Sequence, residues 1–216
     1  MSIPIVAEDA RLLVVDKPEG LSSIPERDLA TPCVQRVLEA SRGERLLVVH
    51  RLDKEVSGLL LFARDAAAHR ALSMAFEARR VLKTYAALAH GRVAEDHGVI
   101  DRPIAEFGSG RMGVHDVRGK PSRTEFRVVR RFPSHTELHA HPVTGRRHQL
   151  RVHFYALGHA LVGDPRYGEP SLQRRYARLC LHALRVTLPH PDGGERTFEV
   201  APPSSFDDVA RTLAAP

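Results

Sequence analysis

The 216-residue sequence has no tryptophan, only two cysteines and no long hydrophobic run. The cysteines, Cys33 and Cys180, stand far apart and form no Cys-x-x-Cys pattern, which argues against a disulfide framework and a cysteine zinc site. No apolar stretch approaches the roughly 20 residues that a transmembrane helix needs. The first ten residues lack the basic segment and apolar core of a signal peptide. We therefore expect a cytoplasmic protein that does not associate with membranes.

Signatures of common cofactor and metal sites are also missing. The sequence contains no phosphate-loop, dinucleotide or His-Glu-x-x-His pattern. Its 13 histidines still raise the hypothesis of a metal-dependent hydrolase, because His135, His139 and His141 share a predicted strand and His148 and His153 a predicted helix. Their spacing matches no zinc motif, so RNA contacts and core hydrogen bonds explain them better. We expect neither a metal nor a cofactor.

The charge balance is basic. Lys and Arg number 32 against 26 Asp and Glu, a formal net charge of +6. Such an excess favours a polyanionic partner, because Lys and Arg bind phosphates and release counterions. Many basic proteins bind no nucleic acid, so the charge alone does not decide. The hydrophobic content of 43% is sufficient for a substantial core.

Short apolar runs and turn signals predict many strands and a few helices. Strands are expected at residues 3–6, 12–15, 46–49, 59–63, 82–89, near 99, 124–132, 136–141, 179–188 and 197–200, and helices at 32–40, 66–80, 145–158 and 205–213. Because the two kinds of element do not alternate strictly, we expect an α+β fold. We predict a single catalytic domain over 1–216, with a mixed, largely antiparallel central sheet flanked by helices and loops.

Residues 50–64 are central to the functional interpretation, because they place a polar loop between two apolar runs. Asp53 lies in this loop, between predicted buried strands that would hold its carboxylate in one orientation. Loops on rigid scaffolds often carry catalytic groups, and a nearby arginine would lower the pKa of such a carboxylate. An ordinary solvated surface turn is an equally good interpretation of this stretch alone.

Two further constellations carry candidate functional groups. Arg147 and Arg151 lie one turn apart on the predicted helix after Gly145, where their donors suit phosphate or RNA backbone contacts. A solvated basic helix face is the alternative. On the predicted strand at 82–89, Lys83 and Tyr85 share a face, and the tyrosine suits base stacking or proton transfer. A half-buried core tyrosine is the alternative there.

These motifs together resemble the RluA family of RNA pseudouridine synthases. The resemblance covers nearly the whole chain, and it depends on several ordered motifs. They are Lys17-Pro18-Glu19-Gly20-Leu21, His50-Arg51-Leu52-Asp53 with Ser57-Gly58-Leu59, Lys83-x-Tyr85, Gly145-Arg146-x-His148-Gln149-Leu150-Arg151-x-His153, Gly158-His159, Val162-Gly163-Asp164-Pro165-x-Tyr167-Gly168 and Leu181-His182-Ala183.

The resemblance implies isomerisation of uridine to pseudouridine in RNA, with the base flipped out of its stack. Asp53 would be the catalytic carboxylate, Tyr85 would stack on the uracil, and Arg151 would pair with Asp53. Arg51 would fill the gap left by the flipped nucleotide, and Leu181 would line the base pocket. The reaction is redox-neutral and adds no group, which agrees with the absence of a cofactor signature.

The chain is most similar to stand-alone family members that act on ribosomal and transfer RNA, without an S4 domain. It departs from the family pattern at Val56, where threonine is usual, and at Arg147, where threonine or serine is usual. We expect a monomer that processes rRNA or tRNA stem-loops. A non-catalytic RNA-binding or ribosome-assembly protein on the same fold is the second hypothesis.

Overall fold

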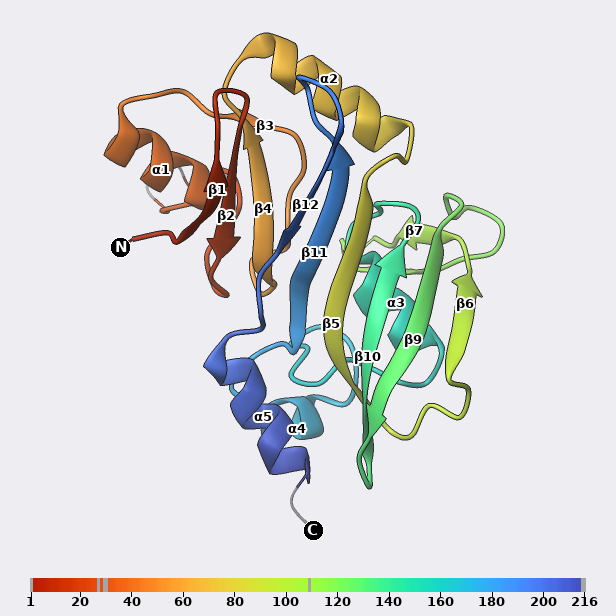
Figure 1. Cartoon of the computed structure of the whole chain (residues 1–216). Coiled ribbons are helices and arrows are strands. Elements are labelled where there is room, and N and C mark those ends of the chain that lie inside the picture. The colour runs from red at the N-terminus through yellow and green to blue at the C-terminus, as the bar shows by residue number, and fades with distance from the viewer. Residues whose placement is uncertain (1, 27, 29–30, 109, 215–216) are drawn as a thin grey trace. The chain divides into compact units, whose positions relative to one another are not determined.

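The computed structural model describes residues 2–26, 28, 31–108 and 110–214 (Figure 1). The chain divides into two compact units. The first comprises Met1–Lys83 and Ala183–Ala201, and the second comprises Thr84–His182 and Pro202–Pro216.

The first unit has an antiparallel sheet with helices. It contains β1 (Ile5–Glu8), β2 (Leu12–Lys17), α1 (Val34–Arg42), β3 (Leu47–Val48), β4 (Ser57–Ala63), α2 (Ala66–Glu77), most of β11 (Leu181–Pro189) and β12 (Glu195–Glu199). β2 pairs with β1 and β4, β3 also pairs with β4, and β11 pairs with β12. All residues of β4 are buried, which explains its continuous apolar run. Helix α2 packs against β3 and β4.

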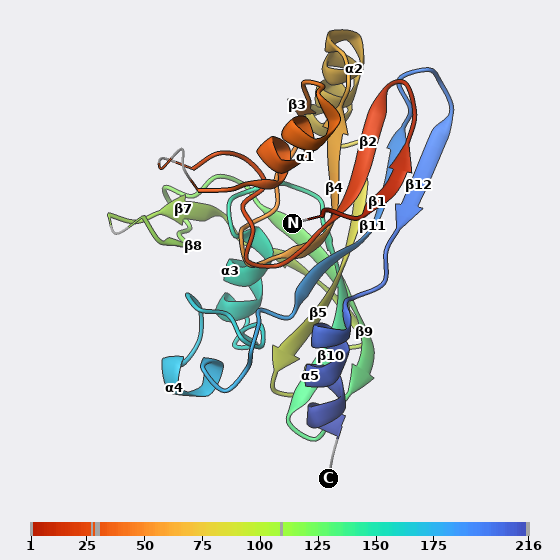
Figure 2. The same ribbon diagram turned by 90° about the vertical axis from the view of Figure 1, so that its left-hand side faces the viewer.

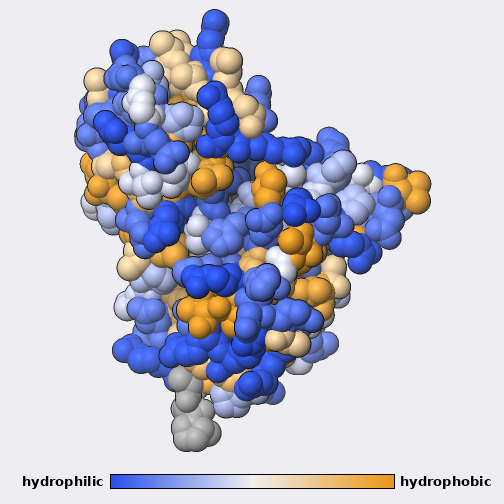
Figure 3. Space-filling model, turned by 45° about the vertical axis from the view of Figure 1, so that its right-hand side comes forward, coloured by the Kyte–Doolittle hydropathy of each residue, from blue (hydrophilic) through white to orange (hydrophobic). Residues whose placement is uncertain are grey.

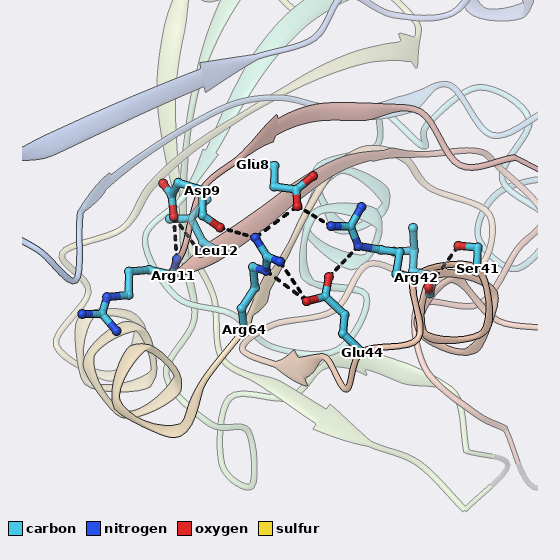
Figure 4. A network of polar contacts seen from close by, with 9 residues as sticks. Glu8, Asp9, Arg11, Leu12, Ser41, Arg42, Glu44 and Arg64 are labelled. Carbon is cyan, nitrogen blue, oxygen red and sulfur yellow. Dashed lines mark hydrogen bonds and ion pairs between the residues drawn. The ribbon is translucent and has the colours of Figure 1, made fainter.

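A network of ion pairs joins the end of β1, the end of α1 with the residues just after it, and the residue that follows β4 (Figure 4). Arg64, just after β4, donates to Glu44 at 2.9 Å and lies 3.1 Å from a carboxylate oxygen of Glu8. Arg42, at the end of α1, binds both of these carboxylates as well. The network thus fixes the β1–β2 hairpin and the end of α1 beside β4.

The second unit is built on four antiparallel strands in the order β5-β10-β9-β6. Its elements are β5 (Leu82–His90), which begins in the first unit, β6 (His97–Asp101), β7 (Ile104–Glu106), β8 (Met112–Val114), β9 (Arg123–Arg131), β10 (His135–Pro142), α3 (Gln149–Ala156), α4 (Pro170–Gln173) and α5 (Ser204–Ala214). Helix α3 packs against β8, β9 and β10 (Figure 2). Phe154 of α3 lies edge-on to Phe126 of β9. The β7–β8 hairpin forms a small separate sheet.

The predicted α+β class and largely antiparallel sheet are confirmed. The loop at 49–56 connects β3 and β4, which pair with each other. Of the two strands predicted to be buried, β4 is buried throughout, whereas both residues of β3 are only half-buried. Asp65 caps α2, accepting a hydrogen bond from Ala68 N at 2.8 Å. The prediction of one domain over 1–216 stays a prediction.

Several boundaries were predicted wrongly. Helix α2 ends at Glu77 rather than Arg80, because Arg79 takes a left-handed backbone with φ of 57°. Helix α3 begins only at Gln149, so Arg147 lies in the preceding turn and does not share a helix with Arg151. The β7–β8 hairpin and α4 were not predicted, because strands of three residues and a helix of four carry too little periodicity.

The surface is mostly polar on the face shown in Figure 3, where apolar side chains form small separate patches. Within the described part of the chain, no helix combines the length and apolarity needed to cross a membrane. Cys33 and Cys180 are both buried.

Candidate active site

The Asp53 loop, residues 49–56, is a tight connection in the first unit. Its backbone turns where Val56 N donates to Asp53 O at 3.1 Å. Leu52 and Val56 are buried, Asp53 is half-buried and Arg51 is exposed. The loop therefore anchors itself through apolar side chains and leaves polar ones, Asp53 among them, accessible to solvent.

A buried lysine binds the backbone of the loop. Lys17, at the end of β2, has no exposed surface, and its Nζ donates to the carbonyls of Pro18, Leu21 and Lys54 at 2.8, 2.6 and 3.1 Å. An ammonium group has three protons to donate, so these three carbonyls can use all of them. Gly20 N also donates to Lys54 O at 2.8 Å. The turn after β2 is thereby joined to the Asp53 loop.

A serine fixes the residue next to Asp53. Ser23 Oγ donates to Leu52 O at 2.8 Å and accepts from Leu52 N at 3.0 Å. One hydroxyl can act as donor and acceptor together, so it satisfies both backbone groups of a buried residue. Because Leu52 lies between Arg51 and Asp53, these bonds restrain the backbone that presents both side chains.

His50 anchors the start of the loop as a neutral imidazole. Leu61 N of β4 donates to His50 Nε2 at 3.1 Å, so the ring carries its proton on Nδ1. The ring stacks on Phe76 with centroids 5.0 Å apart. Desolvation and the charge of Lys83 lower the pKa of His50 to about 3. Burial also lowers the pKa of Lys83.

The low pKa of His50 predicts a loss of stability in acid. Unfolded histidine binds a proton below its ordinary pKa of 6.5, whereas the folded group does so only near pH 3. The free energy of unfolding should therefore fall as pH falls through this window, by up to about 1.4 kcal/mol per pH unit.

Urea unfolding between pH 7 and 4 measures this effect against His50→Gln, whose amide oxygen still accepts from Leu61 N. We expect wild type to lose more stability than the variant as the pH falls. Parallel curves would show that His50 titrates normally in the folded protein.

In the second unit, Arg151 forms a buried ion pair with Asp164. Its Nε and Nη2 donate to Asp164 Oδ2 and Oδ1, both at 2.8 Å, and neither side chain is more than 1% exposed. This two-pronged geometry is the strongest arrangement of guanidinium and carboxylate. The solvated basic helix face considered from the sequence is thus wrong for Arg151.

The sequence did not predict this partner. Asp164 was noted only as part of Val162-Gly163-Asp164-Pro165, with no role of its own. Tyr167, from the same loop, also lies close to Arg151. Its ring centroid lies 5.4 Å from the guanidinium carbon, and its hydroxyl lies 2.9 Å from His148 Nδ1.

The other two candidates of this unit lie on strands. Tyr85 is half-buried on β5, where its backbone is opposite Ala140 of β10. Leu181 is the first residue of β11 and is 3% exposed.

Arg147, in the turn before α3, forms an exposed ion pair with Glu106 of β7 at 3.3 Å.

The clustered histidines make internal hydrogen bonds. His153 binds Thr124 Oγ1 and Arg102 O, both at 2.9 Å. His148 precedes α3 in a left-handed conformation, so the prediction that it shares the helix with His153 was wrong. Among the residues that the structure describes, no three His, Cys, Asp or Glu groups are arranged to hold a metal ion.

Sequence comparison finds one family and closely similar relatives. The family described as RNA pseudouridylate synthase matches residues 11–156. Ribosomal large subunit pseudouridine synthase D of Nitrosomonas europaea is 37% identical over 231 residues, which cover 99% of this chain and 65% of that protein's length. Dual-specificity RNA pseudouridine synthase RluA of Haemophilus influenzae is 38% identical over 198 residues, covering 89% of this chain and 90% of the relative.

Structural comparison agrees. Human RNA Pseudouridylate Synthase Domain Containing 1 superposes with a TM-score of 0.80 at 29% identity and covers all of this chain and 96% of that one. Human RNA Pseudouridylate Synthase Domain Containing 4 gives a TM-score of 0.82 at 27% identity, covering 97% and 92%.

Proposed function

The chain belongs to the RNA pseudouridylate synthase family, with relatives of the RluA type, and from that premise we propose that it isomerises specific uridines to pseudouridine in structured RNA. The observation that carries the proposal is the family match over residues 11–156, which includes Asp53 on its restrained loop. In this reaction the N1–C1′ bond of uridine breaks, the uracil turns, and C5 joins C1′.

We assign the essential carboxylate to Asp53. A half-buried carboxylate on a loop held by Lys17, Ser23 and His50 is pre-oriented, and pre-orientation lowers the entropic cost of reaching the transition state. Its partial exposure also allows a nucleotide to approach.

The remaining candidates are assigned to substrate binding. Tyr85 stacks on the target uracil, and Leu181 lines the apolar side of the base pocket. Arg151 is assigned as the cationic partner of the catalytic carboxylate. Arg51, which is exposed, enters the stack at the place of the flipped nucleotide, where a planar guanidinium suits stacking.

Loops of rRNA or tRNA are the proposed targets, because an unpaired base costs least to flip. The name of the Haemophilus relative records dual specificity, and that of the Nitrosomonas relative records the large ribosomal subunit. The formal charge of +6 supports binding to the RNA backbone. We propose that the protein acts as a cytoplasmic monomer.

Tritium release tests the activity directly. Purified protein is incubated with RNA transcribed from 5-tritiated uridine, and formation of pseudouridine releases the label from C5. Mapping pseudouridines in a deletion strain and its parent then identifies the site. Absence of release from total rRNA and tRNA would contradict the proposal and favour the non-catalytic RNA-binding hypothesis.

Binding should weaken with salt. Each phosphate neutralised by Lys or Arg releases counterions, so the logarithm of the affinity falls linearly with the logarithm of salt concentration. We expect an affinity loss of about tenfold or more between 50 and 200 mM KCl, as a few such contacts would give. Filter binding with an RNA stem-loop measures it, and a flat response would show that the basic surface does not contact phosphates.

A further inference from the structure

We propose that Gln173, the last residue of α4, is a positioning residue that holds the Arg151 guanidinium in place through Asp164. The inference rests on the proposed function, since Arg151 is assigned there to the reaction. Gln173 stands outside all the motifs that carry the family resemblance.

Gln173 holds the loop that contains Asp164 at four backbone points. The side chain is 4% exposed. Its Oε1 accepts from Gly163 N at 2.7 Å and from Asp164 N at 3.2 Å. Its Nε2 donates to the carbonyls of Leu161 and Tyr167 at 3.0 and 3.1 Å. One amide group therefore fixes both sides of the loop.

The same loop is what orients the Asp164 carboxylate. Oδ1 accepts from the backbone nitrogens of Arg166 and Tyr167 at 2.8 and 3.1 Å, in addition to its bond with Arg151. Asp164 thus cannot keep this orientation if the loop around it shifts. Arg151 donates one hydrogen bond to each carboxylate oxygen of Asp164. A rotation of the carboxylate would therefore displace the Arg151 guanidinium or break these two bonds. Gln173 acts on Arg151 through this connection.

A histidine pair holds Gln173 in turn. His90 Nε2 lies 3.2 Å from Gln173 Oε1 and must donate, because this oxygen is an acceptor. Its Nδ1 therefore accepts from His135 Nε2 at 3.1 Å, and His135 Nδ1 accepts from Ser134 Oγ at 2.9 Å. Tyr176 OH also lies 3.1 Å from His135 Nε2. Burial lowers the pKa of both histidines, which favours the neutral forms that this pattern needs.

The chain also leaves space for the amide. A Cβ added at Gly168 would lie 2.4 Å from Gln173 Nε2, and the φ of this glycine is 109°. Glycine thus permits both the backbone conformation and the close approach. An amide so completely bonded to one loop specifies a position of that loop, which an apolar side chain of equal size would not do.

The test replaces Gln173 by Met, which keeps the volume and removes every amide hydrogen bond. We expect kcat for pseudouridine formation to fall by between about 10- and 100-fold, as small displacements of a reacting constellation do. KM for the RNA should change less than twofold, because capture of the RNA backbone does not need Arg151 in one position. The control is Ser171→Ala on the exposed side of α4, whose hydroxyl binds Glu169, and it should keep wild-type kcat. All variants are assayed well below their melting temperatures.

A double-mutant cycle separates positioning from a general loss of structure. In an Arg151→Lys background, Gln173→Met should lower kcat less than twofold further, because the group through which it acts has already been changed. Equal fold losses in both backgrounds would overturn the proposal, as would wild-type kcat in the folded Gln173→Met variant.

A spectroscopic measurement keeps the proposal testable if wild type shows no activity. The Arg151 Nε–H, bonded to Asp164 at 2.8 Å, should give a slowly exchanging NMR signal in the wild type. That protection should be lost in Gln173→Met and retained in Ser171→Ala. Unchanged protection would overturn the positioning role, whereas absence of tritium release by wild type would overturn only the proposed function.

Discussion

Asp53→Asn is expected to lower pseudouridine formation by on the order of 10⁴-fold while RNA affinity stays within about twofold, the pattern for removing a group that acts only in the chemical step. Asparagine has almost the same shape but carries no charge, and it cannot attack C1′ or accept a proton from C2′ as a carboxylate does. The backbone of the loop should be unaffected, since Lys17 and Ser23 bind main-chain atoms of the loop.

Tritium release under single-turnover conditions, together with filter binding, measures both quantities. Asp192→Asn is the matched control, because it removes the charge of an exposed carboxylate that binds Arg11 in the same unit. Its rate should equal that of wild type. An active Asp53→Asn variant would require another residue as the essential carboxylate, and a joint loss of binding would indicate a structural role.

The sequence predicted the Asp53 loop itself better than the contacts that hold it in place. Apolar runs on both sides predicted buried strands, which is confirmed for β4, whereas β3 has only two residues and both are half-buried. Lys17 was noted only as the first residue of Lys17-Pro18-Glu19-Gly20-Leu21, and its burial was not predicted, because lysine is rarely buried. Its Nζ donates to two carbonyls of its own turn, Pro18 and Leu21, and to that of Lys54 in the distant Asp53 loop, and no local pattern encodes this last contact.

The surroundings of Arg151 were harder to predict for a similar reason. Helical spacing placed Arg151 on a helix correctly but extended that helix to Arg147, because periodicity cannot detect the left-handed residue His148 at its start. Asp164 binds Arg151, and Gln173 binds the backbone of Asp164. Asp164 lies in a loop, which has no periodic sequence pattern that could have predicted these contacts. Their roles depend on tertiary packing, which no local sequence pattern encodes.

Breaking the buried ion pair should have the largest effect on stability. Asp164→Leu removes the carboxylate that forms the ion pair with Arg151, whose side chain is only 1% exposed. Removal of one partner from such a pair costs about 3–5 kcal/mol in the free energy of unfolding. Arg151→Met should be destabilising by a similar mechanism, since the Asp164 carboxylate then loses its cation.

The double variant Arg151→Met with Asp164→Leu distinguishes this mechanism from simple loss of packing. It carries no uncompensated charge from the pair, so it should be less destabilised in urea at pH 7 than the sum of the two single variants, by about 2 kcal/mol or more. Full recovery is not expected, because the backbone nitrogens of Arg166 and Tyr167 lose their acceptor. Pseudouridine formation should be lost in all three variants. The double variant can regain stability without Arg151, but it cannot regain the proposed role of Arg151 on the substrate. Strictly additive stabilities would show that the two charges contribute independently, and activity of the double variant would remove Arg151 from the reaction.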